Sequence, residues 1–161
     1  MSKEADLTAR FWKAMRADRT VMLGLPDVEG GHSQPMTALM ESEQGGPLWI
    51  FTSADCDMVA ALDRERDAVM HFASKGHDLF AEIDGRLRID NDRQAIDALW
   101  SPYVAAWFTG KTDPTLRLLR FEPEHARIWR NENSLFAGVR LMLGEDPKKS
   151  YRDKVAEVVL H

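Results

Sequence analysis

The side chains best suited to covalent or metal chemistry are one cysteine and five histidines. Cys56 lies between two acids in the segment Asp55-Cys56-Asp57. Neighbouring carboxylates disfavour the thiolate form, so this cysteine is a poor nucleophile. The histidines are spread singly along the chain, without the spacing of a metal site; they are His32, His71, His77, His125 and His161. These residues predict neither nucleophilic catalysis nor a metal centre.

The common motifs that position phosphates or nucleophiles are missing. The sequence contains no GxGxxG after a strand, no GxxxxGK[ST], no HExxH and no GxSxG. Any redox chemistry would therefore have to come from a bound cofactor. The net charge is −5, and Lys and Arg are mixed with acids, which predicts no binding of nucleic acid. The segment 1–15 carries charges and no apolar run, so we expect no membrane span and a cytoplasmic protein.

Hydrophobic periodicity predicts many short strands and few helices. Leu7, Phe11 and Met15 recur at helical spacing, so a helix is expected over about 6–18, with Asp6 as its N-cap. Further helices are expected after Ser53 or Asp55, after Asp92, and in the apolar stretch 135–143. Apolar runs bounded by turn residues predict strands; they lie at 20–25, 35–41, 48–52, 68–73, 79–83, 86–90, 116–122, 126–130 and 154–160.

This pattern indicates a fold that is mainly β with flanking helices (α+β). Six or more short strands at close spacing, with few helices between them, indicate a closed or half-closed β-barrel. We expect a single domain over 1–161, with the N-terminal helix at about 6–18, the barrel at about 20–130 and a C-terminal helix and strand at about 133–160. A small barrel of this kind leaves an apolar seam that a second copy would cover.

Four segments, in order, carry a resemblance to a known family. They are Gln34-Pro35-Met36-Thr37, then Leu48 to Ser53 (LWIFTS), then Trp100 with Ala106-Trp107-Phe108, and finally Ile128-Trp129. Together they resemble the general stress protein 26 branch of the pyridoxamine 5′-phosphate oxidase-like, FMN-binding split-barrel proteins. The likeness runs from about Thr8 to Leu160.

The resemblance implies a split β-barrel of six or more antiparallel strands. It also implies a homodimer that holds FMN in a cleft between its subunits. It places the flavin ring against Phe51, Thr52 and Ser53 at a strand end, with the segment Gln34-Pro35-Met36-Thr37 approaching from the adjacent strand. Trp107 or Trp129 of the partner subunit would cover the other side of the ring. The alternative for both tryptophans is packing in the core or at the dimer seam. For Trp100 packing is the favoured interpretation.

Two departures from the family bear on the cofactor phosphate. Gln34 occupies the place of an arginine, and Met58 that of a lysine. Losing these cations would weaken phosphate binding by about 1.5–3 kcal/mol for each charged contact. Thr52, Ser53, a helix N-terminus or a basic residue elsewhere could compensate. FMN is the expected cofactor, and FAD or haem remain alternatives.

The resemblance implies a flavin-dependent oxidoreductase acting on an unknown small substrate. Vitamin B6 oxidation itself is not expected, because the chain ends in AEVVLH and lacks the family's Arg-rich C-terminal segment. The alternatives are a non-catalytic flavin-binding general stress protein and a split barrel that has lost its flavin. The sequence identifies no catalytic residue.

Overall fold

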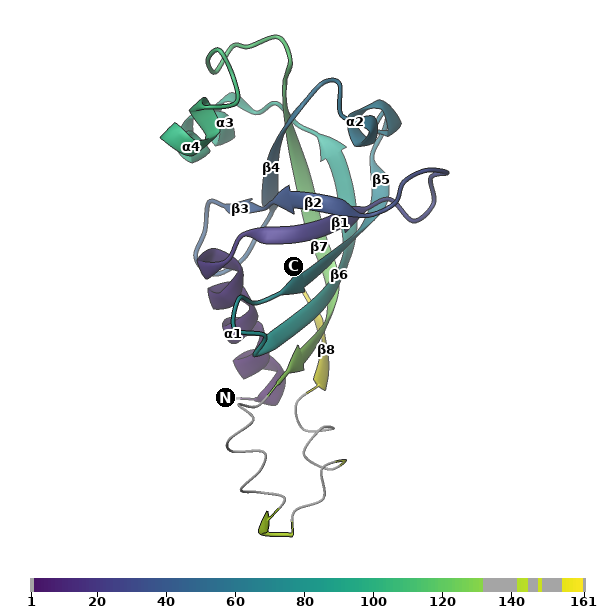
Figure 1. Ribbon diagram of the computed structural model, residues 1–161, viewed down its shortest axis with the longest axis vertical. Helices are drawn as coiled ribbons and strands as arrows, with labels where there is room; N and C mark the ends of the chain where they lie inside the picture. The colour runs from purple at the N-terminus through teal and green to yellow at the C-terminus, as the bar shows by residue number, and fades with distance from the viewer. Residues whose placement is uncertain (1, 132–141, 145–147, 149–154, 161) are drawn as a thin grey trace.

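The computed structural model describes residues 2–131, 142–144, 148 and 155–160 of the chain. Within these residues a mostly antiparallel β architecture carries a few helices at its edges (Figure 1). The strands are β1 Thr20–Gly24, β2 Gln34–Thr37, β3 Leu39–Met40, β4 Leu48–Ser53, β5 Arg66–Ala73, β6 Leu79–Ile89, β7 Leu116–Arg130 and β8 Val155–Val159. The helices are α1 Lys3–Ala17, α2 Asp57–Ala61, α3 Arg93–Leu99 and α4 Pro102–Ala105.

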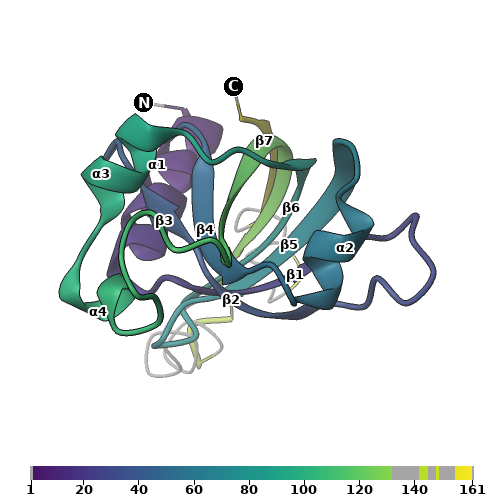
Figure 2. The same ribbon diagram turned by 90° about the horizontal axis from the view of Figure 1, so that it is seen from above.

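The strands form one sheet that curls round on itself. Its order is β2-β1-β5-β6-β7-β4-β3, with β8 added along β7. β2 and β3 stand at opposite ends of this order, yet only Ala38 separates them in the chain. Their connection therefore brings the two ends of the sheet together, and Figure 2 shows the strands curving round a common interior. This confirms the expected mainly β barrel with flanking helices.

The interior of the barrel is filled by alternate residues of the long strands. On β6 the buried residues Leu79, Ala81 and Ile83 alternate with exposed ones, as the two-residue period of a half-buried strand requires. Helix α1, which lies at the lower left of the barrel in Figure 1, adds Phe11 and Met15 to the same core. This core holds the strands in the register on which the site depends.

A second, smaller cluster lies outside the barrel, where α3 and the flanking residues Trp100 and Phe108 cover β4 and β7. Trp49 of β4 and Leu118 of β7 pack there against Ile96 of α3. The neighbouring residues of β4, Leu48 and Ile50, belong to the main core. β4 is therefore buried on both faces over its first half, which fixes the position of its end.

Most predicted elements are confirmed, and the differences have local causes. Helix α1 begins at Lys3 rather than near residue 6, because the hydroxyl of Ser2 caps it and Asp6 lies inside its first turn. Helix α2 is preceded by Cys56, whose side chain makes no capping hydrogen bond, rather than by Ser53 or Asp55. Asp92 caps α3 through its side chain as expected. The predicted strand 35–41 is divided at Ala38 into β2 and β3.

The sequence predicts two strands at 116–122 and 126–130, whereas the structure has the single strand β7. Pro123 lies opposite Gly85 of β6, where the register shifts by one residue. Proline is tolerated at such a bulge because it has no N–H to donate. The extra residue is Glu124, whose backbone carbonyl accepts a hydrogen bond from the amide of Leu160 (2.8 Å). The strands predicted at 79–83 and 86–90 are likewise one strand, β6, which continues through this bulge at Asp84 and Gly85.

The chain end is described in part. The predicted last strand is confirmed as β8, which pairs with β7. The helix expected in 135–143 lies almost wholly outside the described residues. Across the described part of the chain, no helix is both long and apolar enough to cross a membrane.

Candidate functional site

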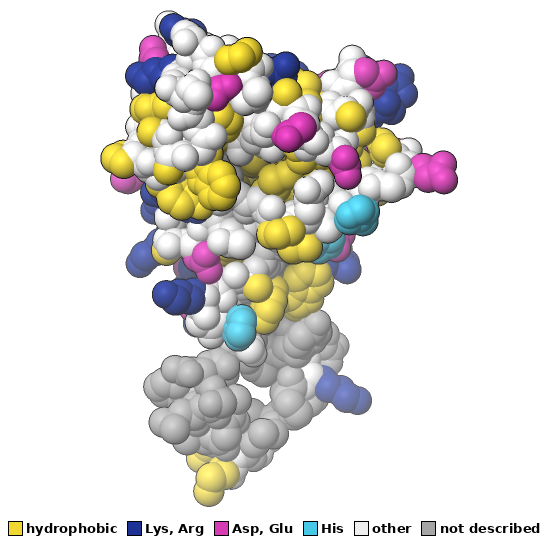
Figure 3. Space-filling view, turned by 45° about the horizontal axis from the view of Figure 1, so that its top comes forward, with side chains coloured by type: hydrophobic (Ala, Val, Ile, Leu, Met, Phe, Trp, Pro, Cys, Tyr) yellow, Lys and Arg dark blue, Asp and Glu magenta, His cyan; other side chains and the backbone are white. Residues whose placement is uncertain are grey.

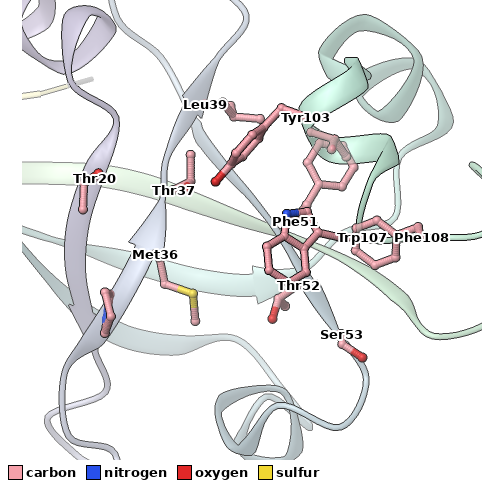
Figure 4. A pocket seen from close by; sticks show the side chains of 12 residues that line it. Thr20, Met36, Thr37, Leu39, Phe51, Thr52, Ser53, Tyr103, Trp107 and Phe108 are labelled. Carbon is pink, nitrogen blue, oxygen red and sulfur yellow. The ribbon is translucent and has the colours of Figure 1, made fainter.

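A pocket of about 450 Å³ opens between the end of β4, strand β2 and the segment that carries α4 (Figure 4). Its volume lies within the range of small-molecule sites. Figure 3 shows hydrophobic side chains gathered on the end of the molecule that carries α3 and α4. The residues around the pocket are Thr20, Pro35, Met36, Thr37, Leu39, Phe51, Thr52, Ser53, Tyr103, Val104, Trp107 and Phe108.

One wall of the pocket is the second half of β4. β3 pairs with β4 only at Leu48 and Trp49, while β7 pairs along the other edge of β4 as far as Ser53. Beyond Trp49, the first edge of β4 is therefore paired with no strand among the described residues, although β2 lies near it. Backbone N–H and C=O groups that alternate along this edge remain available to a ligand, except the Ser53 carbonyl, which accepts a hydrogen bond from the amide of Cys56 (3.0 Å).

Hydroxyl groups supply further polar contacts. Thr20, Thr37, Thr52 and Ser53 all line the pocket. None of these four hydroxyls makes a side-chain hydrogen bond to another residue in the described part of the structure. A hydroxyl both donates and accepts, so this group can contact either kind of polar atom on a ligand.

The opposite wall is aromatic and is held by a ring cluster. Phe51 meets Trp100 edge-on, with ring centroids 6.1 Å apart, and both rings lie 6.4 Å from the ring of Phe108. The cluster attaches the segment after α3 to the end of β4. It thereby places Tyr103 and Trp107 at the mouth of the pocket, where they are 64% and 75% exposed.

The loop that follows Phe108 is organised by one carboxylate. Asp113 accepts hydrogen bonds from the amides of Thr109 and Thr115, both at 2.8 Å, and from the hydroxyl of Thr115 at 2.7 Å. These bonds, the Thr109 amide first, lower the pKa of the Asp113 carboxyl to about 2. The ionised carboxylate thus fixes the turn that leads from the pocket into β7.

Most of the residues predicted to bind a cofactor lie around this one pocket. They come from two strands and from the segment after α4; they are Pro35, Met36, Thr37, Phe51, Thr52, Ser53 and Trp107. Trp107 lines the pocket of its own chain. The resemblance instead implies that Trp107 of a partner subunit would cover the flavin ring. Trp100 packs in the ring cluster, as expected.

The remaining predicted residues, Gln34, Met58 and Trp129, do not line the pocket. Gln34 begins β2 beside it, and its side-chain oxygen lies 4.0 Å from the sulfur of Cys56. Met58 is 3% exposed and packs in the main core, because the first turn of α2 directs it inward. Trp129 lies on β7 opposite Phe80 of β6, away from the pocket. Met58 therefore faces the core and not this pocket.

The sequence alone did not identify Thr20, Leu39, Tyr103, Val104 or Phe108 as pocket residues. Phe108 could have been found, since it directly follows Trp107. Tyr103 carries no motif, and it reaches the pocket because Trp100 and Phe108, on either side of α4, pack on Phe51 of β4.

The electrostatic character of the pocket is neutral. None of its described lining residues is a Lys, Arg, Asp, Glu or His. Within the same part of the chain, no group of three or more His, Cys, Asp or Glu residues could hold a metal ion. The chemistry available is hydrogen bonding from hydroxyls and backbone groups, together with stacking on aromatic rings.

The chain belongs to the pyridoxamine 5′-phosphate oxidase-like family, whose model matches residues 6–150. It is 31% identical over 114 residues to general stress protein 26 of Bacillus subtilis, which covers 68% of this chain and 74% of that protein. The sequence resemblance to that branch is therefore confirmed.

Solved structures agree with the split-barrel fold. The general stress FMN/FAD binding protein of Xanthomonas citri is 55% identical, with a TM-score of 0.76 over 80% of this chain and 92% of that chain. General stress protein 26 of Bacillus anthracis is 16% identical, with a TM-score of 0.65 over 76% of this chain and 92% of that chain. The second likeness shows the fold alone.

Proposed function

We propose that this protein binds a flavin, with the isoalloxazine ring in the pocket between β2 and the end of β4. The observation that carries the proposal is the free edge of β4 beside Phe51, Thr52 and Ser53. A planar ring with a polar pyrimidine edge needs backbone and hydroxyl partners along that edge and apolar contact on its faces. The similarity to the Xanthomonas citri FMN/FAD binding protein supports the same ligand class.

In this proposal the walls of the pocket contact different parts of the flavin ring. The hydroxyls of Thr52 and Ser53, with the backbone of β4, bind the polar edge of the ring. Met36 and Trp107 contact its faces and exclude water from it. When bound, the flavin would supply hydride or electron transfer, and the protein would contribute binding, orientation and a dry surrounding.

FMN is the proposed form of the cofactor. Its phosphate group has fewer binding partners in the pocket than its ring. The described lining of the pocket contains no cation that could make a charge-assisted hydrogen bond. Gln34, next to Pro35, is neutral. We therefore expect riboflavin, FMN and FAD to bind with similar affinities, because the ring supplies most of the binding energy.

The finer proposal is a flavin-dependent oxidoreductase of a small substrate. A non-catalytic flavin-binding protein is the second candidate, because among the lining side chains only Tyr103 could transfer a proton. Reduction of the bound flavin by NADH or NADPH separates the two. Reduction faster than that of free flavin favours the oxidoreductase, and equal rates favour the binding protein.

A homodimer is also proposed, through the outer face of the sheet. Met22 of β1, Phe80 of β6 and Val159 of β8 are 41%, 37% and 54% exposed there. Apolar side chains on an exposed sheet face are suited to a second copy. Trp129 shares this face with Phe80, so it remains a candidate to reach the partner's ring. Sedimentation should give twice the 18.3 kDa mass of the chain.

The test of flavin binding is a titration of the purified protein with FMN, FAD and riboflavin, followed by quenching of flavin fluorescence. Saturable binding of all three is the expected result. Trp107→Ala should weaken it, whereas the matched variant Trp107→Phe, which keeps a stacking ring, should retain most of the affinity. A protein that binds none of the three would overturn the proposal.

A further inference from the structure

The hydroxyl of Tyr103 stands at the mouth of the pocket without a hydrogen-bond partner in the described structure. The side chain is 64% exposed and lines the pocket from α4. Figure 4 shows its hydroxyl end directed toward the β2 side of the pocket rather than toward the ring cluster. A phenol in this position is free to donate a hydrogen bond to whatever enters the mouth.

The position of Tyr103 is fixed by its surroundings. Ser101 caps α4 by accepting a hydrogen bond from the amide of Val104 (3.3 Å), and Pro102 occupies the first helical position. Val104, beside Tyr103 in the chain, is 5% exposed and so anchors the helix on the protein. The buried side chain of Val104 therefore holds α4 in place, and Tyr103 points outward from this fixed helix and not from a free loop.

The chemistry around Tyr103 limits which ligand fits. No described lining side chain carries a charge, so an anionic ligand would lose its hydration without a compensating cation. Trp107, four residues on, offers an exposed aromatic surface at the same mouth. Planar aromatic compounds gain from such a surface, and a neutral oxygen acceptor gains from the phenol.

We propose that the mouth of the pocket binds a neutral, planar aromatic carbonyl compound, of the quinone class, and that Tyr103 donates a hydrogen bond to its carbonyl oxygen. This inference rests on the proposed flavin site, because it names the second ligand of the same pocket. Tyr103 is then the residue that selects carbonyl-bearing rings over hydrocarbons of the same shape.

The probe is 2,3-dimethyl-1,4-naphthoquinone, whose two substituted carbons prevent addition of the Cys56 thiol. The matched hydrocarbon is 2,3-dimethylnaphthalene. Binding is measured by the shifts of the tryptophan indole N–H signals in NMR spectra of the FMN-saturated protein. The Trp107 signal is assigned with the variant Trp107→Phe. This readout does not depend on turnover.

We expect saturable shifts of the Trp107 signal with the quinone. Tyr103→Phe should weaken quinone binding about three- to tenfold, the loss of one neutral hydrogen bond, and leave binding of the hydrocarbon unchanged. A carboxylate-substituted analogue should bind more weakly than the neutral quinone. Equal losses for quinone and hydrocarbon, or unchanged quinone binding, would contradict a hydrogen bond from Tyr103.

Two controls distinguish loss of the quinone site from loss of the flavin site and from a subunit contact at the mouth. Flavin titration of the same samples comes first: normal FMN binding without quinone binding overturns this inference alone, whereas absence of FMN binding overturns the proposed function. Sedimentation of Tyr103→Phe and Trp107→Ala then tests whether a second copy covers the mouth. A change in mass would assign these rings to a subunit contact and overturn the inference.

Discussion

The ring of Phe51 meets the ring of Trp100 edge-on, with centroids 6.1 Å apart and ring planes at 79°. Phe51 lines the pocket, and Trp100 belongs to the segment that carries Tyr103 and Trp107. This contact therefore connects the strand that would bind the polar edge of a flavin with the helix that forms the pocket mouth. Substitutions in the ring cluster should affect stability and ligand binding together.

Trp100→Ala should lower the free energy of unfolding by about 2–4 kcal/mol, because it removes a half-buried ring that packs on two others. It should also weaken flavin binding, since Phe51 and Phe108 lose the ring that holds them together. Urea unfolding and flavin titration measure the two effects. Trp100→Phe keeps an aromatic contact and should lose less of both; equal losses in the two variants would argue against a role for the ring.

The sequence predicts the strands well because their apolar runs are short and bounded by turn residues. The run at 48–52, for instance, becomes β4 and extends by one residue to Ser53. Pro123 leads to the wrong prediction of two strands in place of β7. Only the pairing with Gly85 across the sheet reveals that a bulge accommodates the proline. The bulge depends on a partner strand that is distant in the chain, which local pattern does not contain.

The candidate site also contains residues that the sequence predicts and residues that only the packing reveals. Pro35 to Thr37 and Phe51 to Ser53 stand at strand ends and are recognisable from their motifs. Tyr103 comes to the pocket through packing of its segment on β4, which no motif records. Met58 is the reverse case: its place in a motif suggests a ligand site, whereas its side chain on α2 packs in the main core.

Gly85→Ala should destabilise the barrel by about 1–3 kcal/mol or more, because a Cβ there would lie 2.3 Å from the carbonyl oxygen of Glu122 and 2.7 Å from Cζ of Phe121. The backbone oxygen cannot move without distorting the bulge. Gly110→Ala is the matched control, since nothing lies within 4 Å of a Cβ there; its unfolding midpoint should stay close to that of the wild type. Similar midpoints for the two variants would contradict the close approach at Gly85.

Met58→Lys should lower the free energy of unfolding by about 3 kcal/mol or more, because it places an ammonium group in the main core without a partner. Met58→Leu keeps the volume and should cost less than about 1.5 kcal/mol. Chemical denaturation measures both. If Met58→Lys instead kept full stability and tightened FMN, residue 58 would lie at the phosphate rather than in the core.

Asp113 should make the protein less stable in acid. Its folded-state pKa, about 2, lies below the ordinary value of 3.8, so its contribution is complete above pH 3.8 and is lost as the pH falls through about 2. Asp113→Asn removes the charge that the Thr109 and Thr115 amides stabilise. The difference in stability between wild type and Asp113→Asn should therefore shrink between about pH 4 and pH 2. A difference that stays constant over that range would show that the charge contributes nothing.

Gln34→Arg tests where a flavin phosphate would lie. Gln34 is half-buried beside Pro35 of the pocket, so an arginine there could reach a phosphate at the β2 side. FMN should then bind about tenfold more tightly, and riboflavin, which has no phosphate, should bind as before. Added salt should reduce the gain. Gln34→Met, uncharged and of similar length, is the control and should change neither ligand. If Gln34→Arg improved riboflavin as much as FMN, the phosphate would lie elsewhere.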